Sequence, residues 1–210
     1  MGKTKQYIQS LNQHNDSLLL EMEKYAEEHR VPIMELDGIA FLKQLIRIYQ
    51  PQQLLEIGTA IGYSAIQMAK ASSNVHITTI ERDSTRYQDA AHYVKQAGLT
   101  EQISIVFDDA LEWLEQIPYE QEYDFIFVDA AKGQYQAFVE KINSHLKSGG
   151  ILVVDNVLFK GYVAKEVNDD SRWQSIGEKI NHFNQWLVNH ADYDTTIVET
   201  GDGVAIAVKK

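Results

Sequence analysis

Apolar residues from position 53 onward alternate between two spacings. Short apolar runs, too brief for helices, are each followed by a segment whose apolar residues recur at helical spacing. The runs predict strands at residues 54–57, 75–81, 103–107, 123–128 and 151–154. The segments between them predict helices at 62–71 and 84–97, a short helix through Leu111, Trp113 and Leu114, and a helix from Tyr135 to Leu146 that residues 147–150 end. Because repeated strand–helix units pair in parallel, the pattern predicts an α/β, Rossmann-like fold with a doubly wound sheet.

The first 50 residues lack strands and predict helices alone. One helix is predicted over residues 6–29, and Pro32 separates it from a second that runs from about Asp37 to Tyr49. The apolar stripe of the first helix consists of Tyr7, Ile8, Leu11, Leu18, Leu19, Met22 and Tyr25. This helical extension fits a cofactor lid, a dimer surface or plain packing, and the sequence leaves the three open.

The C-terminal part predicts a loop at 156–172, a long helix and a final hairpin. The helix carries Ile176, Ile180, Phe183 and Leu187 on one face. The hairpin pairs residues 193–199 with 204–208 across a glycine-rich turn, and it adds an antiparallel end to a seven-stranded, mostly parallel sheet. We expect a single domain over residues 1–210, with a helical extension at 1–50 and a sheet core at 51–210.

Composition narrows the class of protein further. The 210 residues include no cysteine, which excludes disulfides and thiolate metal sites, and no apolar run approaches the roughly 20 residues that span a bilayer. We therefore expect no membrane partner and a cytoplasmic location. The net charge of −11 argues against a surface that coats nucleic acid, although a local basic patch remains compatible with it.

The first predicted strand ends in a turn that is typical of nucleotide-like ligands. The motif is Glu56-x-Gly58-x-x-x-Gly62, and its glycines allow a tight turn and close backbone approach because neither has a β-carbon. The second strand ends in Glu81, where a ribose diol would lie. The spacing differs from the G-x-G-x-x-G of dinucleotide sites. An acid beside the turn suits a ligand with a cationic amino-acid end, and the motif resembles the first motif of class I S-adenosylmethionine-dependent methyltransferases. A sharp turn without a ligand is the alternative.

Acids end nearly every predicted parallel strand: Glu56, Glu81, Asp108 with Asp109, Asp129 and Asp155. Asp109 and the backbone of Ala110 can read an adenine edge, or Asp109 can simply cap the helix that begins at Ala110; both can hold together.

The sharpest group of polar residues is Asp129, Asp155 and Asn156. Neighbouring strand tips lie about 5 Å apart, so these oxygen side chains should converge. Oxygen ligands without His or Cys suit Mg²⁺ or another hard divalent cation. The alternative is a capping aspartate and a solvated Asp-Asn turn. Beside a dication, Lys132 loses proton affinity and can act as a base, whereas alone it would be an ordinary surface lysine.

Two longer stretches carry a closer family resemblance. Residues 127–132 (Phe-Val-Asp-Ala-Ala-Lys) with Tyr135, and residues 149–156 (Gly-Gly-Ile-Leu-Val-Val-Asp-Asn), resemble the metal-dependent O-methyltransferases of the catechol and caffeoyl-coenzyme A type. The likeness runs from about Val31 to the C-terminus. It departs at Ala131, where many members carry a second acid, and at Asp108, where many carry glycine.

The resemblance implies roles for individual residues. A divalent cation would lie on Asp129, Asp155 and Asn156, and Lys132 would be the catalytic base, with Asp129 belonging to both the catalytic and the metal-binding sets. Contacts to S-adenosylmethionine would come from Met34, Glu56, Gly58, Ser64, Glu81, Asp109, Ala110 and Asp129. A homodimer is also implied. The compact length and residues 32–35 (Pro-Ile-Met-Glu) resemble the bacterial branch that methylates 5-hydroxyuridine at the tRNA wobble position.

Three functions therefore compete. The leading one is an O-methyltransferase that converts wobble 5-hydroxyuridine to 5-methoxyuridine and has the tRNA anticodon loop as its partner. A single-stranded base can stack on an aromatic residue. Candidates for stacking are Tyr135, Phe159, Tyr162 and Trp173, and candidates for phosphate contact are Lys160, Lys165 and Arg172. The second is the same chemistry on a small catechol-like phenol, which the charge of −11 mildly favours. The third is a non-catalytic cofactor-binding module.

Overall fold

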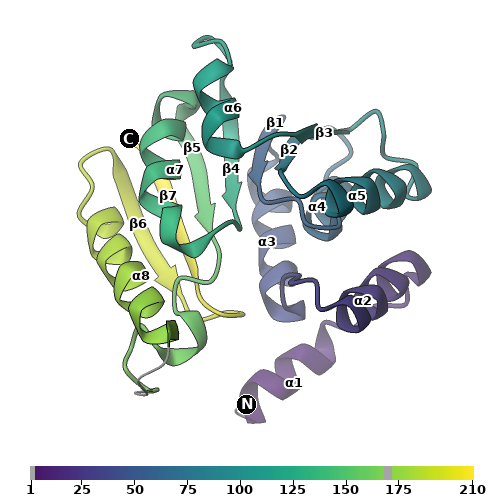
Figure 1. Ribbon diagram of the computed structural model, residues 1–210, viewed down its shortest axis with the longest axis horizontal. Helices are drawn as coiled ribbons and strands as arrows, with labels where there is room; N and C mark the ends of the chain where they lie inside the picture. The colour runs from purple at the N-terminus through teal and green to yellow at the C-terminus, as the bar shows by residue number, and fades with distance from the viewer. Residues whose placement is uncertain (1–2, 168–171) are drawn as a thin grey trace.

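A mixed seven-stranded sheet forms the centre of the protein. The computed structural model describes residues 3–167 and 172–210, and the strand order is β3-β2-β1-β4-β5-β7-β6 (Figure 1). The strands are β1 Gln53–Ile57, β2 His76–Glu81, β3 Ile103–Phe107, β4 Tyr123–Val128, β5 Leu146–Val154, β6 Tyr193–Val198 and β7 Val204–Lys209. β1 to β5 pair in parallel, and β7 pairs antiparallel with both β5 and β6. The predicted α/β fold with a C-terminal antiparallel hairpin is confirmed.

Helices cover both faces of this sheet. They are α1 Lys3–Leu11, α2 Ser17–His29, α3 Leu36–Tyr49, α4 Tyr63–Ala71, α5 Ser84–Gln96, α6 Ala110–Gln116, α7 Tyr135–Ile142 and α8 Arg172–Val188, with 3-10 turns at Lys132–Gln134, Asn143–His145 and Phe159–Gly161. Successive residues of a strand enter opposite cores: Leu54 packs with α2 to α5, whereas Leu55 packs with α6 to α8. Burial on both faces explains why these strands read as continuous apolar runs.

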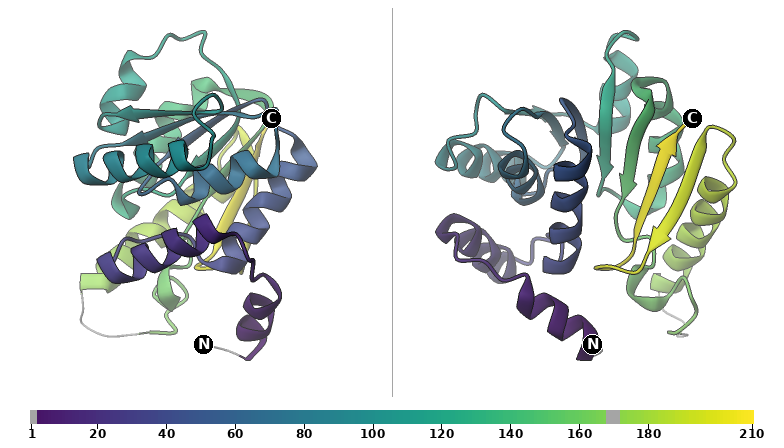
Figure 2. Two further views of the ribbon diagram at one scale, coloured as in Figure 1. Left: turned by 90° about the vertical axis from the view of Figure 1, so that its right-hand side faces the viewer. Right: turned by 180° about the vertical axis from the view of Figure 1, so that it is seen from behind.

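The N-terminal segment differs from its prediction. Instead of one helix over 6–29, α1 and α2 are separate, because Asp16 caps α2 and its carboxylate accepts from the amides of Leu18 at 3.1 Å and Leu19 at 3.2 Å. The apolar stripe is therefore interrupted, and Tyr7 and Leu11 are 64% and 65% exposed. α1 and α2 lie on the side of the molecule toward which β4 and β5 point (Figures 1 and 2).

A second difference concerns residues 143–150. The predicted helix through Leu146 stops at Ile142, and β5 begins at Leu146, which pairs with Tyr123 of β4. Gly150 lies inside the strand at a register shift, where a β-carbon would come within 2.7 Å of the Leu146 side chain. The glycines thus belong to an irregular strand and do not end a helix.

Part of the predicted loop at 156–172 forms the 3-10 turn Phe159–Gly161, and its residues 168–171 lie outside the described part of the chain. Among the described residues, no helix is long and apolar enough to cross a membrane.

Candidate active site

One cavity of about 570 Å³ lies at the carboxyl ends of the parallel strands. Strand order reverses between β1 and β4, and ligands of doubly wound sheets bind at such a point. The cavity is lined by every predicted site residue except Glu56, namely Met34, Gly58, Ser64, Glu81, Asp109, Ala110, Asp129, Lys132, Asp155 and Asn156. The fold therefore brings the expected cofactor half and the expected metal half into one space.

The turn after β1 requires glycine at its first position. Gly58 has φ +101°, and a β-carbon there would lie 2.1 Å from the carbonyl oxygen of Asp129. The position of that carbonyl is fixed, because Asp129 follows β4 directly and its amide donates to the carbonyl oxygen of Ile57 in β1 at 3.0 Å. Gly62 has φ +82° and begins α4, where its α-carbon faces Ala90 of α5. Gly58 therefore forms the tight turn that the motif predicts, whereas Gly62 is favoured by its positive φ, since a β-carbon there would make only ordinary contact with Ala90 at 3.5 Å.

Glu56 lies beneath the cavity floor and is fully buried. Its two carboxylate oxygens accept from the hydroxyls of Ser64 and Thr79, each at 2.5 Å. Burial raises the pKa of Glu56 to about 7, the two hydroxyl donors oppose this, and the negative charges of Asp129 and Glu81 add to it. The sequence analysis missed Thr79, whose only signal is a hydroxyl residue within a buried strand.

Glu81 and Asp109 are held by backbone amides at the ends of β2 and β3. The Glu81 carboxylate accepts from Ala60 of the glycine turn at 2.8 Å and from Arg82 and Asp83 at 3.0 and 2.9 Å. These bonds leave further acceptor capacity on its oxygens for a diol. Asp109 accepts from the amide of Leu111 at 2.9 Å, which confirms that it caps α6.

Asp129, Asp155 and Asn156 converge at the ends of β4 and β5. Asp155 is 2% exposed; one of its oxygens accepts from Asn156 Nδ2 at 3.1 Å, and among the described residues the other has no hydrogen-bond partner. Lys132 Nζ donates to Asn156 Oδ1. Burial raises the pKa of both aspartates, repulsion from Asp129 raises that of Asp155 further, and Lys132 opposes the rise for both.

This donor set fits a hard divalent cation. Two carboxylates and an amide oxygen are ligands that Mg²⁺ prefers, and a buried carboxylate oxygen without a donor is a position that a cation would satisfy. The described chain holds no metal-binding cluster of three or more His, Cys, Asp or Glu side chains, so this set, which has only two carboxylates, depends on the amide of Asn156.

Aromatic and cationic residues lie near Lys132 at one end of the cavity. Phe159 and Trp173 line it, and Lys160 Nζ and the Arg172 guanidinium lie 5.4 and 4.5 Å from the Trp173 ring centroid. Two other aromatic candidates, Tyr135 and Tyr162, and the cationic candidates Lys165 and Arg172 do not line the cavity.

Tyr135 instead supports the floor, where its hydroxyl donates to the Asp155 carbonyl at 2.9 Å. Asp202 also lines the cavity, a position the sequence analysis did not identify. Its only sequence signal is its place in the Gly-Asp-Gly turn of the final hairpin, and it accepts from the Lys160 amide at 2.5 Å.

A glycine turn after β1, an acid at the end of β2 and a parallel sheet finished by an antiparallel hairpin define the class I methyltransferase fold. The chain belongs to the O-methyltransferase family, whose family model matches residues 9–210. This family contains S-adenosylmethionine-dependent O-methyltransferases of the caffeoyl-coenzyme A and catechol type. The expected family is thus confirmed at this level, and membership disfavours a non-catalytic module.

Individual relatives agree with this assignment. A crystal structure of a candidate caffeoyl-CoA O-methyltransferase from Staphylococcus aureus is 36% identical, covers 100% of both chains and has a TM-score of 0.90. An O-methyltransferase from Bacillus cereus, crystallised with SAH, is 28% identical over 99% of this chain and 97% of that one, with a TM-score of 0.82. A catechol O-methyltransferase from Niastella koreensis is 30% identical over 214 residues, which cover 97% of this chain and 95% of the relative.

Glu56 should make the free energy of unfolding depend on pH. Its pKa rises from 4.5 to about 7 in the folded protein, so between these values the folded protein binds a proton that the unfolded chain has released. Stability from this group is therefore lost as the pH rises through that window, by roughly 3 kcal/mol. Glu56→Gln should remove this dependence. The free energy of unfolding of the variant should therefore increase relative to that of the wild type from about pH 4.5 to about pH 7.

Urea unfolding of both proteins at several pH values in that window measures the difference. Glu120→Gln, at an exposed position before β4, is the matched control and should follow the wild type. Parallel pH profiles for Glu56→Gln and the wild type would contradict the buried, proton-binding state of Glu56.

Proposed function

We propose that this protein transfers the methyl group of S-adenosylmethionine to a hydroxyl that has a second oxygen beside it, and that the acceptor is 5-hydroxyuridine at the wobble position of tRNA. The observation that carries the proposal is a single cavity of about 570 Å³ shared by the glycine turn and the Asp129, Asp155 and Asn156 group. Methyl transfer needs donor and acceptor side by side, and fixing both reactants supplies roughly 7–11 kcal/mol by effective-molarity estimates.

The cofactor would lie across the glycine turn. Because Gly58 has no β-carbon, the backbone of the turn could lie close to the cofactor. Glu81 would accept hydrogen bonds from the ribose hydroxyls, and Asp109 and Ala110 would lie beside the adenine. Met34 and Ser64 line the same end. Glu56 would act from beneath, since its carboxylate holds the Ser64 hydroxyl and contributes negative potential toward a cationic amino-acid end.

Asp129, Asp155 and Asn156 would hold Mg²⁺ or another hard divalent cation. When bound, such an ion lowers the pKa of an acceptor hydroxyl that coordinates it. The protein's own residues would do the rest: Lys132, beside Asn156, would receive the acceptor proton in its neutral amine form and become an ammonium, and Phe159 lines the same part of the cavity.

A catechol and 5-hydroxyuridine both present two neighbouring oxygens, the latter through its 5-hydroxyl and 4-carbonyl. Two features support the tRNA acceptor. Residues 32–35, which carry the resemblance to the tRNA-modifying branch, line the cavity, and Lys160 and Arg172 flank Trp173 where a splayed base and its phosphates could be held. The second candidate, a small catechol-like phenol, is favoured by the net charge of −11 and by the catechol O-methyltransferase relative.

Parallel assays with tRNA and with small phenols can determine the acceptor. Purified protein with S-adenosylmethionine and Mg²⁺ should convert 5-hydroxyuridine to 5-methoxyuridine in tRNA taken from a strain that lacks the gene. Mass spectrometry of the digested nucleosides detects the product. Parallel assays with catechol and caffeate provide the comparison. Efficient methylation of the phenols with unmodified tRNA would overturn the tRNA acceptor and leave the O-methyltransferase assignment standing.

Asp155→Ala should abolish divalent-cation binding and turnover together. Loss of a direct ligand should weaken Mn²⁺ binding by more than the roughly 10–100-fold that loss of an outer partner costs. Electron paramagnetic resonance of Mn²⁺ titrations measures binding independently of activity. Asp108→Asn is the matched control, because Asp108 lines the same cavity outside the proposed ligand set and should preserve binding. Turnover of Asp155→Ala in EDTA at the wild-type rate would refute the metal site.

Lys132→Met should lower kcat by roughly 10²–10⁴-fold, the usual contribution of a positioned acid or base. Methionine keeps the apolar stem beside Phe159, whose ring centroid lies 5.8 Å from Lys132 Nζ, so the affinity for SAH should not change. Single-turnover kinetics and calorimetry measure the two quantities. Lys165→Met in the loop outside the cavity is the control, assayed with a small phenol. An unchanged kcat in Lys132→Met would remove this lysine from the chemistry.

A further inference from the structure

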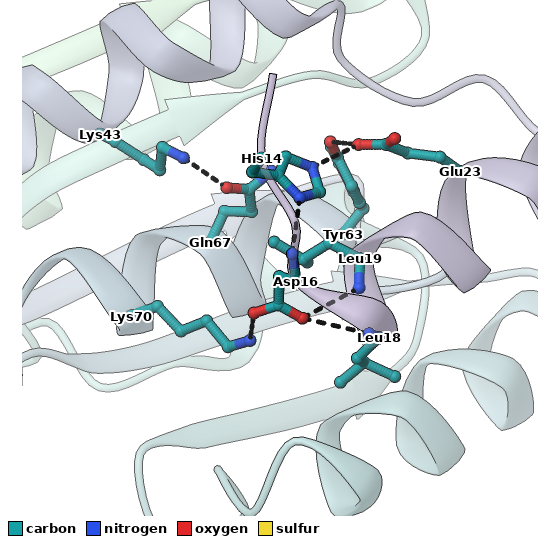
Figure 3. Close-up of polar contacts among 9 residues, drawn as sticks. All are labelled: His14, Asp16, Leu18, Leu19, Glu23, Lys43, Tyr63, Gln67 and Lys70. Atoms are coloured by element: carbon teal, nitrogen blue, oxygen red, sulfur yellow. Dashed lines mark hydrogen bonds and ion pairs between the residues drawn. The ribbon is translucent and has the colours of Figure 1, made fainter. Parts of the chain in front are cut away.

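Glu23 of α2 contacts the first residue of the helix that follows the glycine turn. One carboxylate oxygen, Glu23 Oε1, accepts from the Tyr63 hydroxyl at 2.5 Å and lies 2.8 Å from His14 Nε2 (Figure 3). His14 Nδ1 accepts from the Asp16 amide at 3.3 Å, so Nε2 carries the hydrogen and donates to Glu23. The helical extension thus supplies an oriented acceptor to a residue of the sheet core.

Tyr63 lies at the edge of the cavity, so a small shift of this residue would change the cavity's shape. It is the first residue of α4 and lines the cavity together with Ser64, whose hydroxyl is bonded to Glu56. α4 begins at Gly62 without a side-chain cap. The side chains of Tyr63 and Ser64 therefore both hold this end of the helix, through Glu23 and Glu56 respectively.

Glu23 is the acceptor for the Tyr63 hydroxyl, and the neighbouring Gln67 amide oxygen already accepts from Lys43. Tyr63 is only 2% exposed, and burial together with the Glu23 bond raises its pKa, which keeps it a protonated donor. A buried donor that loses its acceptor destabilises the arrangement that buried it. Without Glu23, we expect the start of α4 to shift until the hydroxyl reaches water or another acceptor.

Other polar contacts join the helical extension to the core away from the cavity, and they can be compared with the Glu23–Tyr63 contact. Asp16 binds Lys70 at 2.5 Å, in the last turn of α4 (Figure 3). The Tyr25 hydroxyl of α2 donates to Asp89 of α5 at 2.9 Å. Both attach the same extension to the core, yet neither Tyr25 nor Lys70 lines the cavity.

We propose that Glu23 is a positioning residue for the cofactor: through Tyr63 it fixes the start of α4 and, with it, the glycine turn and Ser64. This role rests on the proposed function, in which S-adenosylmethionine occupies that end of the cavity. It gives part of the helical extension a role in cofactor binding although Glu23 itself does not line the cavity.

The test compares full-length variants for SAH affinity, by isothermal titration calorimetry, and for steady-state kinetics. Glu23→Ala and Tyr63→Phe should each weaken SAH binding and raise the KM for S-adenosylmethionine about tenfold, as expected for one lost buried hydrogen bond, with little change in kcat. Glu23→Gln keeps an acceptor oxygen and should restore most of the affinity.

Tyr25→Phe is the matched control, because it removes the same kind of hydroxyl–carboxylate bond from the same helix. It should lower thermal stability and leave SAH affinity at the wild-type value. Hydrogen exchange without cofactor should be faster over residues 59–66 in Glu23→Ala and unchanged there in Tyr25→Phe.

Wild-type affinity in Tyr63→Phe, or equal losses in Tyr63→Phe and Tyr25→Phe, would overturn the role of Glu23. If Glu23→Ala does not fold, as judged by circular dichroism, Tyr63→Phe and Glu23→Gln decide the matter. Failure of the wild type to bind SAH would instead refute the proposed function itself.

Discussion

The close approach of β1 and β4 at their carboxyl ends is the constraint on which the site depends. The Asp129 carbonyl occupies the space that a β-carbon on residue 58 would need, and the Asp129 amide is bonded to the end of β1. The glycine turn and the first acid of the proposed metal set are therefore parts of one backbone arrangement. The two ends proposed to hold the cofactor and the cation are thus built on directly contacting backbone.

Burial of acids is the second theme of the structure. Glu56, Glu81 and Asp155 are all largely removed from water. Burial raises the pKa of Glu56 and of Asp155, because it disfavours their charged forms. The structure compensates each in a different way: hydroxyl donors at Glu56, backbone amides at Glu81, and at Asp155 a single amide donor, which leaves one oxygen without a partner in the described part of the chain. This incomplete compensation distinguishes Asp155 from the acids with structural partners and makes it the best candidate to hold a cation.

The helical extension is joined to the core by polar contacts as well as by packing. Leu19 and Met22 are buried against the sheet core, whereas Tyr7 and Leu11 of α1 are exposed. The polar contacts of Glu23, Asp16 and Tyr25 fall on α4 and α5, the helices that follow β1 and β2. The extension therefore contacts the two helices that carry the backbone beside the proposed cofactor.

The sequence by itself determined the order of strands and helices. Strands that are buried on both faces appear as continuous apolar runs, and the helices between them appear as amphipathic segments. It also predicted that the acids and glycines at the parallel strand ends gather at one edge of the sheet, where all of them except Glu56 and Gly62 line one cavity. It failed where local signals competed with tertiary ones. Residues 147–150 look like a helix end, yet pairing with β4 makes them strand, and the stripe at 6–29 hides a cap at Asp16.

Only the tertiary structure showed that Glu56 lies under the cavity floor, that Thr79 and Asp202 belong to the site, and that Glu23 reaches Tyr63. Each of these depends on contacts between residues far apart in the chain, whose geometry is set by how helices pack on the sheet. Periodicity and motif spacing report which face or end a residue occupies, but they carry no information on which distant side chain it meets there.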